Sequence, residues 1–531
     1  MLAQAGNHQA GVAGAAGGIG MGRATAAGDT AVRYLGHAGF IVSHAGIRLL
    51  IDPWFYPAFL GAWFPYPDNR QLLPGVTGGS FDALYLSHAH EDHFDERLLS
   101  QLDRRLTVLV PRYRSKVMTR RLTALGFHNL IPLGHRDQHT LADGFTVTML
   151  LDTSHKEDSG LLLDVGGFRF LDLNDCNTSL SELPADIDLL AAQYSGAMWY
   201  PNCYQYPAGV MARKVAAVRA SLMETLILKV RLAGARTYLP SAGPPCFLDP
   251  ALAAYNDRSA TIFPIWDDVS TEFAAACPGT GVLRIAPGDE LDQLAGGEPP
   301  RLVRSGADPW PADPGRYLAG YRARRAAEWL EYYSSPGDPV TAPELEEYFR
   351  RLQQWNKRFL GDYRKDIRLV ADGRYWGIRL GRLAEQFVFE DEPIDADYTL
   401  RVPPRVLRAV LAGRAGWEEA LLSMRLTLHR APDVFDLTLM SLLRYGNHPA
   451  QTMQLVRERE NTETIERDGL RLQRYCPHAG EDLTFATVCD GVLECPRHHW
   501  KWDVHTGDCL DGGTVRLRVE PLEAPSASPR T

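Results

Sequence analysis

The sequence predicts an α/β fold with three structured parts: a strand-rich layered domain, a mixed α+β segment and a small all-β domain. Three observations predict it. Apolar runs of strand length, separated by turn residues, follow one another from Ala31 to about residue 287. Helical spacing dominates residues 316–449. Short strand-like runs then return among cysteines and histidines in residues 450–522.

Length and composition agree with this organisation. At about 150 residues per domain, a chain of 531 residues is expected to hold three to four domains. Apolar residues are 45% and charged residues 23% of the chain, the usual mix of a soluble globular protein. Lys and Arg total 56 and Asp and Glu total 65, so the net charge is −9. This charge and the lack of a long basic stretch argue against a nucleic-acid partner.

The chain shows no apolar run of the ~18 residues that a membrane-spanning helix needs, and no signal-peptide pattern. We therefore expect a cytoplasmic protein without a membrane partner. Gly- and Ala-rich residues begin the chain, and a Pro- and Gly-rich stretch follows the layered domain. The expected units are a flexible leader (1–30), the layered domain (31–287), a linker (288–315), the helical and mixed segment (316–449), the all-β domain (450–522) and a disordered tail (523–531).

Individual elements can be placed in the layered domain and the segment after it. AVRYLGHAGFIVSHAGIRLLIDP predicts two or three strands with a turn at His44–Gly46, and FDALYLS, FTVTML, GLLLDV and FRFLDL predict further strands. Residues 213–234 have helical spacing and end at a glycine. We expect Lys229 and Arg231 on a solvated face of this helix, with anion binding as the alternative.

The segment 316–449 begins with helical patterns. Thr341 and Glu344 fit a capping box ahead of ELEEYFRRLQQWNKRFL. The segment shows no metal-ligand pattern, so we interpret it as a packing or dimerisation domain, which makes a homo-oligomer one open possibility.

A first group of metal ligands follows the strand FDALYLS. The stretch SHAHEDHFD contains H-x-H-x-D-H, and strand alternation points its first two histidines to the same side. Imidazoles with a carboxylate suit zinc, iron or manganese. A histidine in DTSHKEDSG and an aspartate in DLNDCN lie in loops after later strands, and the aspartate could bridge two ions. The candidate ligands and catalytic residues are His88, His90, Asp92, His93, His155 and Asp175.

This succession resembles the metallo-β-lactamase fold over about residues 31–285. The resemblance implies an αββα sandwich with one metal on His88, His90 and His155. It places a second metal on Asp92 and His93, with Asp175 as the bridge. The family usually adds a histidine near the C-terminal end of the fold, but this sequence has none between His155 and His429. That ligand is therefore absent or replaced, which leaves one metal or two open.

Two flanking motifs narrow the resemblance. LGHAGF contains His37, and IDPWF contains Asp52 and Trp54. Both motifs are similar to the branch of the fold that includes ascorbate-6-phosphate lactonases and CMP-N-acetylneuraminate hydroxylases. His37 is either an outer hydrogen-bond donor, a substrate contact or a structural histidine. Asp52 and Trp54 are expected to support the site rather than to act in catalysis.

A second group of ligands lies near the C-terminus. Cys476-x-His478, sixteen residues, then Cys495-x-x-His498 is the ligand spacing of a Rieske [2Fe-2S] centre. Two thiolates hold one iron of such a cluster and two imidazoles hold the other. A Cys₂His₂ zinc site is the alternative, although this order of ligands is not that of a zinc finger.

The sequence around the Rieske motif adds detail. WKWDVHTGDCL, after the second cysteine, also resembles the Rieske family, which commonly has glycine where this chain has His499. Cys489 and Cys509 are interpreted as ordinary thiols. The domain therefore looks closer to the oxygenase type of Rieske domain.

Together the two motifs resemble the CMP-N-acetylneuraminate hydroxylases with the domain order reversed. The resemblance implies a Rieske-dependent monooxygenase that hydroxylates or N-oxygenates a small molecule. Its expected cofactors are a [2Fe-2S] cluster, one or two non-haem iron ions, with zinc or manganese as the alternative, and O₂. The expected electron donor is a ferredoxin, a cytochrome b5-like protein or a flavin reductase. His478 and His498 would face outward as the exit route for electrons.

LLAAQYSGAMWYPNCYQYP is similar to a segment of the same family and is rich in aromatic and polar residues. It could line a substrate pocket, with aromatic packing at the edge of the core as the alternative. The candidate substrate contacts are Tyr194, Trp199, Tyr200, Asn202 and Tyr204.

Two functions of other classes stay open at this point. A zinc- or manganese-dependent hydrolase of a lactone, ester or phosphodiester would use the first motif alone. A redox sensor or electron-transfer protein would use mainly the second.

Overall fold

The computed structural model describes residues 30–522 except 154–155, 308–310, 384 and 393. The expected leader, apart from Thr30, and the expected tail lie outside the described residues, as does the predicted ligand His155. Within the described part, every helix is too short or too polar to cross a membrane.

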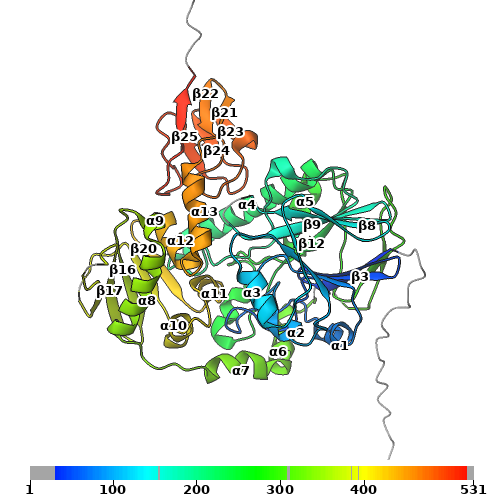
Figure 1. Ribbon diagram of the computed structural model, residues 1–531, viewed down its shortest axis with the longest axis horizontal. Helices are drawn as coiled ribbons and strands as arrows, with labels where there is room; N and C mark the ends of the chain where they lie inside the picture. Colours follow the sequence, from blue (N-terminus) through cyan, green and yellow to red (C-terminus); the bar gives the residue numbers. More distant parts are fainter. Residues whose placement is uncertain (1–29, 154–155, 308–310, 384, 393, 523–531) are drawn as a thin grey trace, which may run out of the picture.

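Two β-sheets lie face to face in the N-terminal part of the chain, which we call the layered domain (Figure 1). The first sheet has the order β15 (Arg301–Val303), β14 (Glu290–Asp292), β1 (Ala31–Gly36), β2 (Gly39–His44), β3 (Ile47–Ile51), β4 (Ala83–Tyr85), β5 (Thr107–Pro111) and β6 (Leu130–Leu133). The second has the order β13 (Gly281–Val282), β12 (Thr237–Ser241), β11 (Leu189–Gln193), β10 (Phe168–Asn174), β9 (Ser159–Val165), β8 (Phe145–Leu151) and β7 (Gln138–Ala142). The helices are η1 (Arg70–Leu72), α1 (Leu73–Thr77), α2 (Glu96–Leu99), α3 (Val117–Ala124), η2 (Leu180–Glu182), α4 (Ala208–Ala233), η3 (Pro250–Asn256) and α5 (Trp266–Ala276).

Apolar side chains hold the layers together. Phe40 and Leu49 of the first sheet and Phe145 and Phe170 of the second are fully buried between the sheets. The outer face of the first sheet packs on α2 and α3, and that of the second packs on α4 and α5. This arrangement is the predicted αββα sandwich.

The predicted elements of the layered domain are present. The chain turns at His44–Gly46 between β2 and β3, and the four later apolar runs form β4, β8, β9 and β10. Helix α4 begins five residues before the predicted start at residue 213 and ends at Gly234, whose φ of 57° is left-handed. Glycine adopts this conformation without the steric penalty of a Cβ, which explains the stop.

Lys229 differs from its prediction. It is 6% exposed rather than solvated. Its ammonium group donates hydrogen bonds to the carbonyl oxygen of Cys176 at 3.2 Å and to Oδ1 of Asn177 at 3.0 Å. Arg231 lies on the exposed face of α4, as expected. The two side chains differ because only Lys229 faces the loop after β10.

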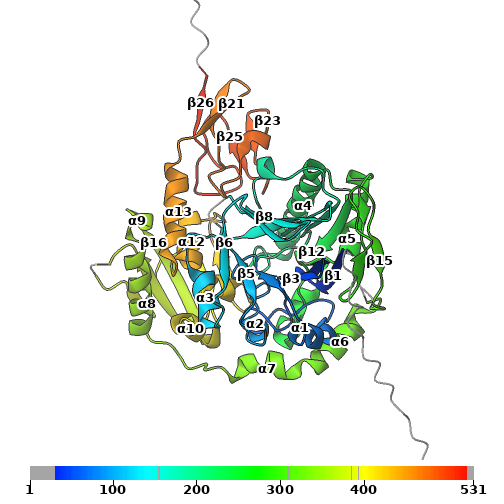
Figure 2. The ribbon, with the colours of Figure 1, turned by 45° about the vertical axis from the view of Figure 1, so that its right-hand side comes forward.

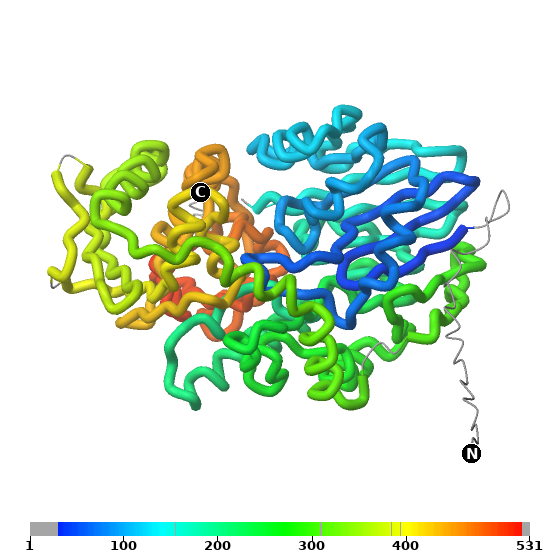
Figure 3. Tube along the Cα trace, turned by 90° about the horizontal axis from the view of Figure 1, so that it is seen from below, coloured from blue at the N-terminus to red at the C-terminus, as the bar shows by residue number. Residues whose placement is uncertain are grey.

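The expected linker 288–315 contains the last two strands at one side of the first sheet, β14 and the edge strand β15. Val32 of β1 pairs with Leu291 of β14, and β14 pairs with β15. Leu291 is fully buried. Three-residue strands are too short to show an alternating pattern, so the Pro- and Gly-rich composition concealed them. The chain then continues through α6 (Pro314–Arg324) and α7 (Ala326–Ser334), which run along one side of the molecule (Figures 1 and 3).

The next part of the chain, residues 342–460, is the middle domain. Its sheet has the order β18 (Val388–Glu390), β17 (Arg374–Leu380), β16 (Lys365–Ala371), β19 (Tyr398–Arg401) and β20 (Thr427–Arg430). Its helices are α8 (Ala342–Trp355), α9 (Lys357–Leu360), α10 (Pro404–Leu411), α11 (Trp417–Leu422), α12 (Leu437–Tyr445) and α13 (Pro449–Glu460). As predicted, Glu344 accepts a hydrogen bond from the backbone N–H of Thr341 at 2.8 Å ahead of α8.

The middle domain shares one apolar core with the layered domain. Trp63 and Trp199 of the layered domain belong to the same buried cluster as Leu421 and Met424 of the middle domain. Figure 3 shows the two domains side by side. A shared core fixes their relative position, so side chains of α11 can contribute to a site in the layered domain.

The C-terminal domain, residues 464–521, is all-β and stands above α4 and α13 (Figures 1 and 2). It consists of the three-stranded sheets β21 (Thr464–Arg467), β22 (Leu470–Gln473) and β26 (Val519–Pro521), and β23 (Thr487–Cys489), β24 (Val492–Glu494) and β25 (Lys501–Asp503), with η4 (Leu483–Phe485). Leu472, Leu493 and Trp502 form its core. Residues 450–460, which were expected in this domain, are helical and place Leu455 in the core of the middle domain.

Candidate metal centres

The first centre lies where strands of both sheets end. His37 follows β1, Asp52 follows β3, His88 lies three residues after β4, and Asp175 follows β10. Ligand sites of open α/β sheets commonly lie at such carboxyl ends. His37 and Asp52 have φ angles of 52° and 35°, a left-handed backbone that is uncommon outside glycine and concentrates at functional sites.

His93 is oriented by a buried carboxylate. Oδ2 of Asp52 lies 2.8 Å from Nδ1 of His93, and Oδ1 of Asp52 accepts a hydrogen bond from the backbone N–H of Ser87 at 2.8 Å. Both side chains of the pair are fully buried. The other ring nitrogen of His93, Nε2, therefore points inward and lies 3.2 Å from Oδ1 of Asp175.

The other two histidines of the motif show the same arrangement. Nδ1 of His88 lies 3.3 Å from Oδ1 of Asp158, and Nε2 of His90 lies 3.7 Å from Oε2 of Glu418. Their remaining nitrogens, Nε2 of His88 and Nδ1 of His90, face each other at 2.9 Å. Metal-binding histidines typically direct one ring nitrogen to an outer carboxylate and the other to the ion, so this geometry fits a metal site.

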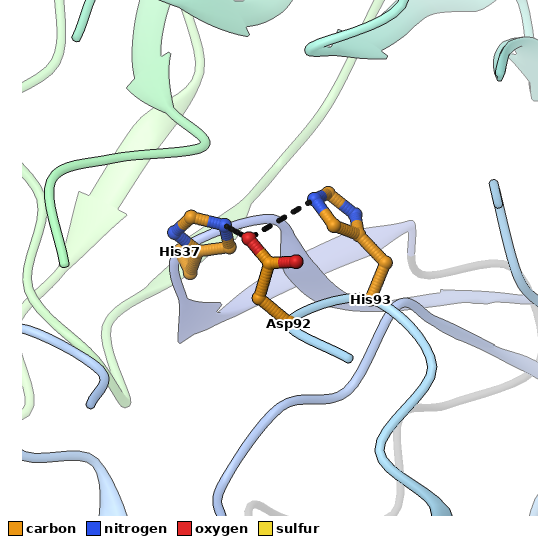
Figure 4. Close-up of side chains that lie close together, drawn as sticks. All are labelled: His37, Asp92 and His93. Atoms are coloured by element: carbon orange, nitrogen blue, oxygen red, sulfur yellow. Dashed lines mark ion pairs between the residues drawn. The ribbon is translucent and has the colours of Figure 1, made fainter. Parts of the chain in front are cut away.

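Ligand atoms meet in two overlapping groups. One atom each from His88, His93 and Asp175 lie within 4.8 Å of one another, and the same holds for His37, Asp92 and His93. Figure 4 shows the second group, in which Nε2 of His37 lies 3.3 Å from Oδ2 of Asp92. His93 belongs to both groups.

The charge of the site also fits a bound cation. Burial and the nearby Asp175 carboxylate raise the pKa of Asp158 well above its usual value, and burial does the same to the pKa of Asp172. Burial and the neighbouring His93 hold the pKa of His88 well below its usual value, which keeps its ring in the neutral, ligating form. Buried carboxylates that outnumber their cationic partners are typical of sites that a metal ion neutralises.

His37 lies next to the candidate ligands. The sequence has no histidine between His155 and His429 that could be a sixth ligand, but His37, near the N-terminal end of the domain, lies beside Asp92 and His93. The ring of Trp54 packs edge-on against His37 at 4.8 Å, and Trp54 is fully buried. Nothing in the spacing of LGHAGF indicates this position, because the contact depends on the packing of β1 against the loop after β4.

Glu418 lies beside His90, and no pattern in the sequence indicates this position. It lies on α11, more than 300 positions from His90 along the chain. Arg444 donates a hydrogen bond to its carboxylate, and the side chains of Arg444 and Glu418 are 19% and 15% exposed. Burial disfavours a charged His90, but the Glu418 carboxylate outweighs this and raises the pKa of His90 to about 9.

We expect Glu418→Gln to lower the metal affinity of the site by about 10- to 100-fold, because outer carboxylates fix the orientation of a ligating ring. Titration of the metal-free protein with Fe²⁺ or Zn²⁺ measures this. Glu347→Gln, an exposed position of the same domain, is the matched control and should bind as the wild type does. An affinity for Glu418→Gln within twofold of the wild type would contradict the role.

The second centre lies in the C-terminal domain. Cys476 and Cys495 are buried, and all eight cysteines of the chain are free of disulfides. The rings of His478 and His498 lie 5.0 Å apart. Nδ1 of His498 is buried without a hydrogen-bond partner among the described residues, as expected of a nitrogen that ligates iron. Two thiols and two neighbouring imidazoles fit a Rieske cluster.

The two candidate cluster histidines are partly exposed and lie near the rest of the chain. The ring of His478 stacks on Trp500 with centroids 3.8 Å apart and lies 6.0 Å from Phe435 of the middle domain. Next to His498, Arg497 contacts Asp152 of the layered domain. His478 thus lies at the interface with the middle domain, and the residue before His498 lies at the interface with the layered domain.

The predicted substrate contacts lie mostly in packed positions. Tyr194 is 2% exposed and packs on Trp266 at 5.3 Å. Asn202 donates a hydrogen bond to the carbonyl oxygen of Ala260 and accepts one from the N–H of Ile262. These contacts favour the structural alternative for both residues.

Three aromatic residues of the same segment contact the middle domain. The guanidinium of Arg444 lies 4.8 Å from the ring of Trp199, and that of Arg430 lies 5.7 Å from Tyr200 and 4.9 Å from Tyr204. Such cation–π contacts hold the two domains together.

Comparison with known proteins adds to this geometry. A beta-lactamase superfamily domain model matches residues 31–184, and a Rieske [2Fe-2S] domain model matches residues 451–518. A Rieske 2Fe-2S iron-sulfur protein of Mycolicibacterium smegmatis is 30% identical over 530 residues, which cover 92% of this chain and 100% of that protein. The chain belongs to this family. The predicted metallo-β-lactamase fold and C-terminal Rieske domain are therefore confirmed.

This chain is also similar to a hydroxylase over part of its length. Cytidine monophosphate-N-acetylneuraminic acid hydroxylase of Danio rerio is 24% identical over 338 residues, which cover 58% of this chain and 56% of the hydroxylase. Among solved structures, CmlA, a diiron beta-hydroxylase from Streptomyces venezuelae, aligns with 17% identity and a TM-score of 0.33 over 51% of this chain and 55% of CmlA.

Proposed function

We propose that the protein is a Rieske-dependent non-haem iron monooxygenase that hydroxylates or N-oxygenates a small molecule. One observation carries the proposal: a histidine–carboxylate metal site and a Rieske ligand set lie in loops that contact each other within one chain. Arg497, between Cys495 and His498, donates a hydrogen bond to the carbonyl oxygen of Asn177, two residues after Asp175. A hydrolase would have no use for an electron carrier in this position. The similarity to a hydroxylase supports the same interpretation.

The residues divide into those that would hold each group and those that position them. Cys476, His478, Cys495 and His498 would hold the [2Fe-2S] cluster, and His37, His88, His90, Asp92, His93 and Asp175, with the undescribed His155, would hold one or two iron ions. When bound, the cluster supplies single electrons and the iron supplies reductive activation of O₂.

The outer carboxylates and the walls of the site have their own tasks. Asp52 and Glu418 fix the orientation of the rings of His93 and His90, so that the other ring nitrogen of each would be directed at the ion. The side chain of His90 is 30% exposed, whereas that of His93 is fully buried. The site is therefore more accessible at His90, next to α11, than at His93, and the fully buried Trp54 packs against His37.

Metal analysis of protein purified without oxygen tests the proposal. We expect a Rieske-type EPR signal after reduction and further iron beyond the two atoms of the cluster. After reduction by dithionite, O₂ should reoxidise the cluster faster in protein with the second iron site filled than in protein from which a chelator has removed that iron. A cluster accompanied by two zinc ions per chain would instead support the hydrolase. A ferredoxin, cytochrome b5-like protein or flavin reductase is the proposed donor.

A further inference from the structure

The loop that begins with Asp175 is held by side chains of the C-terminal domain. The carbonyl oxygen of Asn177 accepts a hydrogen bond from Arg497. The backbone N–H of Leu180 and the hydroxyl of Ser179 each donate to Oε1 of Glu481 at 3.4 Å. The loop after β10 therefore begins with the candidate metal ligand Asp175, and its later residues contact the C-terminal domain.

Arg497 lies in the loop between Cys495 and His498 and contacts the loop that contains Cys476 and the loops after β8 and β10. Its Nη1 donates to the carbonyl oxygen of Ala479 at 3.2 Å, and its Nε lies 3.2 Å from Oε2 of Glu481, both in the loop that contains Cys476. Its Nη2 lies 3.4 Å from Oδ2 of Asp152, which directly follows β8. A planar guanidinium can donate hydrogen bonds to all of these acceptors at the same time, because it is the one side-chain group with five N–H donors in a rigid fork.

The contacts are fully desolvated. The side chains of Arg497, Asp152 and Glu481 are 3%, 0% and 2% exposed. Buried charges without partners are strongly disfavoured, so each member requires the others. Lys229 of α4 holds the same loop through hydrogen bonds to the carbonyl oxygen of Cys176 and to Oδ1 of Asn177. Such an arrangement tolerates one relative position of the two domains, unlike a solvated surface contact.

We propose that Arg497, together with Glu481, is a positioning residue that docks the [2Fe-2S] loops onto the Asp175–Leu180 loop and so sets electron transfer within one chain. The covalent and hydrogen-bonded connection runs from His498 through Arg497 to Asn177 and Asp175. This electron-transfer role rests on the proposed function. Each transfer oxidises the reduced cluster by one electron and reduces the metal site by one, and an external one-electron donor of the ferredoxin class restores the cluster.

Arg497→Met in the full-length chain tests the docking role by hydrogen–deuterium exchange. Methionine keeps much of the apolar stem and removes all five donors. We expect peptides covering residues 175–182 to exchange at least tenfold faster, with the Rieske EPR signal intact and β23–β25 unchanged. Arg471→Met, an exposed arginine of the same domain paired with Glu466, is the matched control and should exchange as the wild type does. Exchange of residues 175–182 within twofold of the wild type overturns the docking role.

Reoxidation of the dithionite-reduced cluster by O₂ tests the electron-transfer role. We expect it to be at least tenfold slower in Arg497→Met than in Arg471→Met, and equal rates overturn that role. If the wild type reoxidises equally fast with and without its second iron site, the proposed function fails, whereas the exchange result still decides the docking role. Arg497→Lys keeps the positive charge but removes the forked set of donors. We expect its exchange and reoxidation rates to lie between those of the wild type and those of Arg497→Met. It carries the same test if Arg497→Met does not fold.

Discussion

His88→Ala is expected to lower turnover by more than about 100-fold while leaving the Rieske EPR signal unchanged. Loss of an outer partner of a metal ligand typically costs 10- to 100-fold in metal affinity or activity, so loss of a ligand should cost more. His88 is buried at the point where Nε2 faces His90 and Nδ1 faces Asp158. Iron content and steady-state O₂ consumption measure the effect.

The control for this variant is His128→Ala, an exposed histidine of the same domain that lies in the loop after α3. It should retain wild-type iron content and turnover, because it contacts neither centre. If His88→Ala keeps its non-cluster iron and its activity, the first centre does not hold the catalytic metal. The Rieske signal should persist in both variants, since the C-terminal domain has its own core.

Cys476→Ala should have the second large effect, the complete loss of the cluster. Two thiolates hold one of its irons, and the remaining Cys495 cannot hold that iron alone. We expect no Rieske EPR signal, loss of two irons per chain and multiple turnover at background level. The iron of the layered domain should remain, because none of its candidate ligands lies in the C-terminal domain.

Cys489→Ala is the matched control for the cluster variant. Cys489 lies on β23 of the same domain, is exposed and is free, so its removal should leave both the EPR signal and turnover unchanged. Full multiple turnover by Cys476→Ala would refute the electron-relay function. That result, combined with intact zinc in the first centre, would favour the hydrolase.

The local motifs of this chain could be interpreted without a structure. H-x-H-x-D-H places its side chains in the loop and turn that follow one strand, and C-x-H with C-x-x-H places two pairs on two short loops. In both, the spacing within a few residues fixes which atoms can meet. The strands around them were predictable for the same reason, since alternation over five to seven residues reports burial directly.

Contacts between distant segments were not predictable. His37 joins Asp92 through the packing of β1, and Glu418 reaches His90 because two domains share one core. Lys229 looked solvated because helical spacing reports which face a residue occupies but not what covers that face. The strands β14 and β15 were missed because three residues give no period to detect.

The sequence by itself determined the kinds of atoms in each centre and the two families of domain, because ligand type and close spacing are local properties. Tertiary structure decided which nitrogen of each histidine points inward, that the middle domain contributes Glu418, and that Arg497 joins the two sets of loops. The physical reason is that a carboxylate or guanidinium acts on whatever lies within about 3–4 Å. For buried charged groups, the distance between the two side chains is set by how the domain cores pack, and these cores can bring together segments that are hundreds of residues apart in the sequence.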